Sequence, residues 1–134
     1  MINCANIPSI SIFLYKSNIE MTCVWNGLIN KLKLNISVHN LYEKIKNENK
    51  ITENVIINGL ELTENQKKEN YERISNISNI HNGYDMSTCD PLLILISELY
   101  EVNIRHAFNQ YVILYFNTKA NNTINVCSNN NHFW

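Results

Sequence analysis

A cysteine and a histidine near opposite ends of the 134-residue chain are the residues best placed to do chemistry together. Cys23 follows the polar stretch "KSNIEMT" and opens "CVWNGLINKLKL", where apolar residues recur at helical spacing. At a helix N-terminus the macrodipole and the unpaired N–H groups favour a thiolate. His132 follows a predicted strand, in "SNNNHFW". A thiolate beside an imidazole is the core of a cysteine protease, so we expect Cys23 as nucleophile and His132 as its base.

The same residue types also have an ordinary structural interpretation. A lone cysteine among apolar neighbours is more often a small core residue, and a histidine near a chain end is more often an exposed side chain. The remaining cysteines lie in apolar or strand contexts and are interpreted as structural: Cys4, Cys89 and Cys127, the last being the nearest to the candidate site because it precedes "SNNNH". Three histidines without a convincing partner are interpreted as surface or core residues: His39, His81 and His106.

Four segments are predicted to be helices. The first begins at Cys23, the second is capped by Ser37 in "SVHNLYEKIKNEN", and the third opens with a capping box between Thr63 and Gln66. The fourth, "CDPLLILISELYEV", is apolar enough to be buried and carries Pro91 in its first turn. The first of these helices is expected to supply the N-terminus at which Cys23 lies.

Short runs of β-branched and aromatic residues predict strands. One is "SISIFLY" at 9–15, and three more follow the last helix: "NIRHAF", "YVILYFN" and "TINVCS". The short connections between these three indicate an antiparallel meander or hairpin. Helices followed by a small C-terminal sheet predict an α+β fold, and the length fits a single domain spanning 1–134.

Composition excludes several classes of function. The net charge is −1, with Lys and Arg spread along the chain, so the sequence has no electrostatic footprint for nucleic acid or an anionic membrane. No apolar run reaches the roughly 20 residues that span a bilayer, and the N-terminus lacks a positive n-region. The cysteines form no CxxC pair, so we expect reduced thiols, no metal and no cofactor. We therefore expect a cytoplasmic monomer.

The two ends of the chain together resemble the ovarian tumour (OTU) family of papain-like cysteine deubiquitinases. "EMTCVW" is similar to the family's nucleophile loop with an aromatic two places after the cysteine, here Trp25. "LISELYEVNIRHAF" looks like its helix running into a strand, and "TINVCSNNNHFW" is similar to its closing strand and histidine–aromatic pair. The resemblance implies helices packed on a small, mainly antiparallel sheet.

The resemblance also implies roles for neighbouring residues. Backbone N–H groups of Glu20, Met21 and Thr22 would form the oxyanion loop, although Glu20 and Met21 stand where the family has Asp and Gly. Trp25 and Trp134 would flank a narrow substrate channel. The family's orienting Asp or Asn often lies two places after the histidine, where this chain has Trp134. Asn130 or Asn129 would then take that role, or the enzyme works with a Cys–His dyad, as some viral members do.

The sequence thus predicts a cysteine-dependent deubiquitinase whose partner is ubiquitin or a ubiquitin-like protein. The excess of Asn and Ile is typical of AT-rich genomes, and with the compact, divergent domain it suggests a viral protein or polyprotein segment acting in the host cytoplasm, or a protein from an intracellular bacterium. Two alternatives remain open: a viral polyprotein-processing protease that uses the same residues on peptide bonds, and a papain-like interaction module in which Cys23 and His132 are not aligned.

Overall fold

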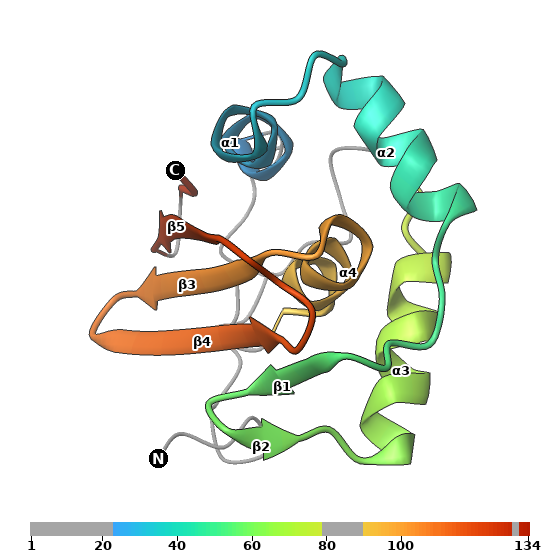
Figure 1. The fold of residues 1–134 in the computed structure, drawn as a ribbon. Helices are drawn as coiled ribbons and strands as arrows, with labels where there is room; N and C mark the ends of the chain where they lie inside the picture. Colours follow the sequence, from blue (N-terminus) through green and yellow to red (C-terminus); the bar gives the residue numbers. More distant parts are fainter. Residues whose placement is uncertain (1–22, 79–89, 130–131) are drawn as a thin grey trace.

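The computed structural model describes residues 23–78, 90–129 and 132–134, which form an α+β fold of helices packed on one mixed β-sheet (Figure 1). The helices among these residues are α1 (Cys23–Leu32), α2 (Val38–Asn47), α3 (Glu64–Ser75) and α4 (Pro91–Tyr100). The strands are β1 (Val55–Ile57), β2 (Leu60–Glu61), β3 (Asn103–Phe108), β4 (Tyr111–Asn117) and β5 (Thr123–Ser128).

The strands lie in the order β2-β1-β4-β3-β5. Among the strands that the structure describes, three of the four pairings are antiparallel, and β5 pairs with β3 in parallel, with Ile104 opposite Ile124. Side chains on β4 alternate between core and solvent: Ile113 and Tyr115 are buried, whereas Leu114 is exposed. This two-residue period places one face of the sheet against the helices.

Helix α4 is the centre of the core, because eight consecutive residues from Pro91 to Glu98 are buried. Asp90 caps its N-terminus by accepting a hydrogen bond from the Leu92 N–H at 2.7 Å, and Pro91 follows at a position where no N–H is needed. The Tyr115 hydroxyl accepts from the Asp90 N–H at 3.0 Å. The start of α4 is therefore attached to β4.

A buried carboxylate fastens the loop before β1 to the same helix. Glu98 accepts hydrogen bonds from the backbone N–H groups of Glu53 and Asn54 at 3.0 and 2.9 Å. Burial by itself raises the pKa of Glu98, but these hydrogen bonds and one from the Asn54 side chain outweigh it and hold the pKa below its usual value. Glu98 is thus ionised in its structural role.

Helix α1 lies beside α2 and β5 (Figure 1). Its buried face carries Val24, Trp25 and Leu28, and the Trp25 ring meets Tyr42 of α2 edge to face with centroids 5.8 Å apart. This packing fixes the direction of α1. It also leaves the first residue of the helix close to the end of the described chain.

The structure confirms the four predicted helices, including the Ser37 cap and the Thr63–Gln66 capping box, and the three predicted strands after α4. The predicted antiparallel meander is wrong in one respect. After the β3–β4 hairpin the chain crosses back, so that β5 pairs with β3 in parallel and not with β4. The predicted strand at 9–15 lies outside the described residues.

The hairpin of β1 and β2 was not predicted from the sequence. Its strands have only three and two residues, joined by Asn58 and Gly59, which both adopt positive φ. Asn-Gly is the residue pair that such a two-residue turn prefers. Among the described residues, no helix is both long enough and apolar enough to cross a membrane.

Candidate active site

Cys23 is the first residue of α1, and its side chain is half-buried. Its Sγ atom accepts a hydrogen bond from the backbone N–H of Phe133, with 3.2 Å between nitrogen and sulfur. These two residues are 110 positions apart in the sequence. The fold therefore brings the helix start and the end of the described chain into direct contact.

The segment 132–134 reaches Cys23 by folding back along β5. Backbone hydrogen bonds join Cys127 and Trp134 in both directions, at 2.7 and 2.8 Å, and Ser128 forms an antiparallel bridge with Phe133. The reversal is closed by Asn129, whose N–H donates to the His132 carbonyl and whose Oδ1 accepts from the His132 N–H, both at 2.9 Å. Residues 132–134 are therefore paired with β5 at the edge of the sheet.

The Phe133 side chain anchors this segment to α1. It is 1% exposed and lies directly on the backbone of the helix at Gly27. A Cβ atom at Gly27 would be 2.7 Å from Phe133 Cδ1, closer than side chains approach without displacement. Glycine at this position therefore permits the close contact between α1 and Phe133.

A buried histidine supports Phe133 from the sheet side. The His106 ring lies in β3 with its centroid 6.2 Å from that of Phe133, and its Nε2 is 2.6 Å from the Ser128 hydroxyl oxygen. Burial lowers the pKa of His106 to about 4, so the ring is neutral near pH 7. Its Nδ1 has no hydrogen-bond partner among the described residues. His106 is therefore a core residue, as one of the two sequence interpretations had it.

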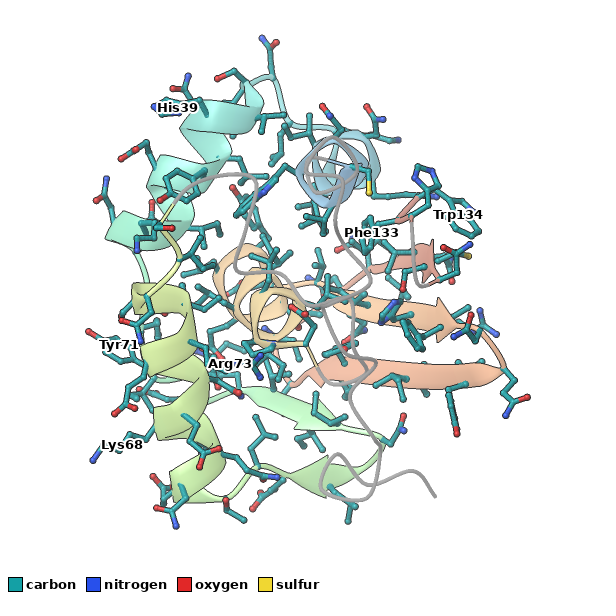
Figure 2. The ribbon with its side chains drawn as sticks, turned by 180° about the vertical axis from the view of Figure 1, so that it is seen from behind. His39, Lys68, Tyr71, Arg73, Phe133 and Trp134 are labelled. Atoms are coloured by element: carbon teal, nitrogen blue, oxygen red, sulfur yellow. The ribbon has the colours of Figure 1, made fainter. Side chains whose placement is uncertain are left out.

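An open pocket of about 470 Å³ lies over this contact. The His132 ring stacks on the Trp134 indole, with centroids 5.3 Å apart and planes 16° from parallel. Figure 2 shows Trp134 at the margin of the molecule and Phe133 further in, next to α1. The described residues that line the pocket are Cys23, Asn26, Gly27, Asn30, Lys31, His132, Phe133 and Trp134.

The structure brings together three of the predicted site residues: Cys23, His132 and Trp134 line the same pocket. The prediction that Trp25 lines the channel is corrected, because Trp25 is 1% exposed and packs in the core. Two residues along a helix correspond to a rotation of about 200°, which directs Trp25 away from the side where Cys23 lies. Four predicted residues lie outside the described part of the chain: Glu20, Met21, Thr22 and Asn130.

Sequence reasoning missed the α1 side of the pocket and the backbone donor. Asn26, Gly27, Asn30 and Lys31 follow Cys23 at spacings of three, four, seven and eight, which share one face of a helix. That pattern is readable in the sequence once the helix is placed. The Phe133 N–H has no such signal, because every residue except proline carries one.

The electrostatics of the pocket favour an ionised thiol. The helix N-terminus and the Phe133 N–H both present partial positive charge at the sulfur, and no lining side chain among the described residues is a carboxylate. A thiolate that shares a pocket with an exposed imidazole can attack a carbonyl carbon, and the imidazole can exchange protons with the leaving group. The described residues contain no group of three or more His, Cys, Asp and Glu side chains that could hold a metal ion.

Comparisons with protein-family models, with curated proteins and with solved structures gave no match to this chain.

Proposed function

We propose that this protein is a cysteine-dependent isopeptidase that removes ubiquitin or a ubiquitin-like modifier, with Cys23 and His132 as the catalytic pair. One observation carries the proposal: Cys23 and His132, 109 residues apart, line one solvent-accessible pocket, and the residue after His132 donates a hydrogen bond to the Cys23 sulfur. Cys23 is half-buried against the core and His132 is exposed, so both side chains are accessible from the pocket.

The first half of the reaction is acyl transfer to the enzyme. The Cys23 thiolate attacks the carbonyl carbon of the isopeptide bond, forming a C–S bond and a tetrahedral oxyanion. The protonated His132 ring then gives its proton to the leaving amine as the C–N bond breaks. Backbone N–H groups of residues 20–23 are proposed as donors to the oxyanion, as the resemblance to the OTU family implies.

The second half is hydrolysis of the resulting thioester. His132 removes a proton from water, whose oxygen attacks the acyl carbon, and the C–S bond breaks to release a carboxylic acid and the Cys23 thiolate. The proton on His132 is then available for the next leaving amine. The cycle needs no cofactor, because the thiol and the imidazole carry all the proton and acyl transfers.

The OTU-type fold and the choice of substrate rest on the sequence resemblance. A five-stranded mixed sheet with helices is compatible with that fold class. Trp134, 48% exposed at the rim of the pocket, is proposed to narrow the path to Cys23, so that a substrate ending in glycines is preferred over bulkier ones.

The test is labelling by ubiquitin that carries an electrophile at its C-terminus. Wild-type protein is expected to form a covalent adduct, and Cys23→Ala to form none. Cys127→Ala is the matched control, because Cys127 is also half-buried but does not line the pocket. If folded wild-type protein neither forms an adduct with this probe nor cleaves ubiquitin chains, the proposal is refuted. Cleavage of peptides without reaction toward ubiquitin would favour the processing-protease alternative.

A further inference from the structure

We propose that the backbone N–H of Phe133 is a positioning donor for the nucleophile, which holds Cys23 Sγ in place and stabilises its thiolate. This inference rests on the proposed function only in taking the Cys23 thiolate as the nucleophile of the isopeptidase. The hydrogen bond itself is a property of the folded chain. It adds a backbone group to a catalytic pair that sequence reasoning assigned to two side chains.

The contact has the chemistry that an ionised acceptor prefers. The donor nitrogen lies 3.2 Å from Sγ. A hydrogen bond to a charged acceptor is about twice as strong as one between neutral groups, so the donor favours thiolate over thiol. In the thioester intermediate the sulfur is uncharged and accepts this bond weakly. The donor therefore also favours departure of the sulfur when the thioester is hydrolysed.

The direction of the N–H follows from strand pairing. In an antiparallel pair, successive residues turn their N–H groups alternately toward and away from the partner strand. The Trp134 N–H points to β5, where it donates to the Cys127 carbonyl at 2.8 Å. The Phe133 N–H accordingly points away from β5, toward α1 and the sulfur of Cys23.

The Phe133 side chain keeps the donor at that position. Its ring is enclosed between Gly27 of α1 and His106 of β3, and its backbone is bridged to Ser128, whose hydroxyl contacts His106 at 2.6 Å. These contacts hold Phe133 from the helix side and from the sheet side. The donor thus approaches the sulfur with little freedom to move.

A single-atom substitution tests the donor without changing any side chain. A synthetic peptide of residues 127–134 begins with Cys127, so it can be joined by native chemical ligation to residues 1–126 activated as a thioester. One peptide replaces the Phe133 N–H with an ester oxygen. A second replaces the Trp134 N–H instead, which removes a hydrogen bond to β5 but leaves the sulfur's donor intact. The all-amide ligation product is the reference.

The readout is the rate at which iodoacetamide alkylates Cys23 from about pH 5 to about pH 10, resolved by mass spectrometry, with Cys127 as an internal reference in the same molecule. The Phe133 ester is expected to slow alkylation of Cys23 at neutral pH by about tenfold and to move its profile to higher pH. The Trp134 ester is expected to keep the profile of the all-amide protein.

Two results would overturn the inference: an unchanged profile in the Phe133 ester, or equal displacement in both esters when circular dichroism shows all three proteins folded. The proposed function is tested separately on the all-amide protein with the ubiquitin electrophile. If the Phe133 ester slows alkylation but the all-amide protein does not react with the ubiquitin electrophile, the donor role is supported and the isopeptidase function is refuted. If the all-amide protein reacts with ubiquitin but the Phe133 ester alkylates normally, the function is supported and the donor role is refuted.

Discussion

At the scale of single residues, two histidines with exposed side chains should differ sharply in their effect on activity. His132 lines the pocket with Cys23, whereas His39 lies on α2, 3.7 Å from Glu43 and away from the pocket. We expect His132→Ala to lower kcat for cleavage of an isopeptide-linked ubiquitin dimer by about 10²- to 10⁴-fold, the range for loss of a general acid–base. His39→Ala should leave kcat unchanged. Equal activity of the two variants would exclude His132 from catalysis.

Residue types pointed to Cys23 and His132 as a candidate pair, and the structure places both on one pocket, but they did not indicate the backbone donor. Cys23 and His132 could be selected because few side chains can act as nucleophile and base. The prediction for Trp25 was wrong because it considered only that Trp25 is two positions from Cys23. The helix rotates between these residues, so the Trp25 ring faces the core. The Phe133 N–H depends on the pairing register of residues 132–134 with β5, and one residue of slip would reverse its direction.

At the scale of elements, the contact between α1 and Phe133 depends on a glycine. In most helices Gly→Ala is stabilising by about 0.5–1 kcal/mol. At Gly27 the new methyl group would lie 2.7 Å from Phe133 Cδ1, and overpacking of this kind costs about 1–3 kcal/mol. We therefore expect Gly27→Ala to lower the free energy of unfolding in urea titration and to slow alkylation of Cys23, because Phe133 must shift.

Asn30→Ala is the control for this substitution. Asn30 lines the same pocket from the same helix, is exposed, and gains helix propensity on replacement by alanine. It should be neutral or slightly stabilising and keep the wild-type alkylation rate. If Gly27→Ala behaves like Asn30→Ala, the proximity of α1 to Phe133 has no influence on the thiol.

Elements with strong local signals were predictable, and those defined by distant pairing were not. Ser37, Thr63 and Asp90 mark their helix starts because their side chains satisfy N–H groups within the same turn. The parallel pairing of β5 with β3 is not contained in either strand, since both read as ordinary half-buried runs. The two short strands β1 and β2 offered the β-branched run Val55–Ile57 and the Asn58–Gly59 turn as signals, which the sequence interpretation overlooked.

At the scale of the whole molecule, the buried His106 makes stability depend on pH. Its pKa is about 4 in the folded protein, against about 6.5 when unfolded. Between about pH 4 and pH 6.5, His106 is therefore protonated in the unfolded chain but neutral in the folded protein. The free energy of unfolding rises with pH across this range by about 3 kcal/mol. Urea titrations near pH 4.5 and near pH 7 should show most of this difference.

His106→Phe isolates the histidine from carboxylates that titrate in the same range. Glu98, with its lowered pKa, contributes stability that is lost as pH falls through its folded pKa, and this loss persists in the variant. We expect the wild-type minus variant difference in unfolding free energy to grow from pH 4.5 to pH 7. A constant difference would contradict the assignment of a neutral, buried His106.

The overall class was predictable because helical periodicity recurs up to Tyr100 and β-rich runs follow from Asn103 onward, so both signals are spread over many residues. The assembly of the site was harder to predict, because it depends on one reversal after β5 and one crossing from β4 to β5.

The hydrogen bond between residues 23 and 133 also makes reactivity a report on tertiary structure. During synthesis Cys23 emerges long before Phe133, and throughout that interval its thiol lacks this donor. The same holds for any molecule in which the sheet edge has opened, even if α1 persists. The alkylation rate of this one thiol therefore reports whether residues 132–134 are seated between β5 and α1.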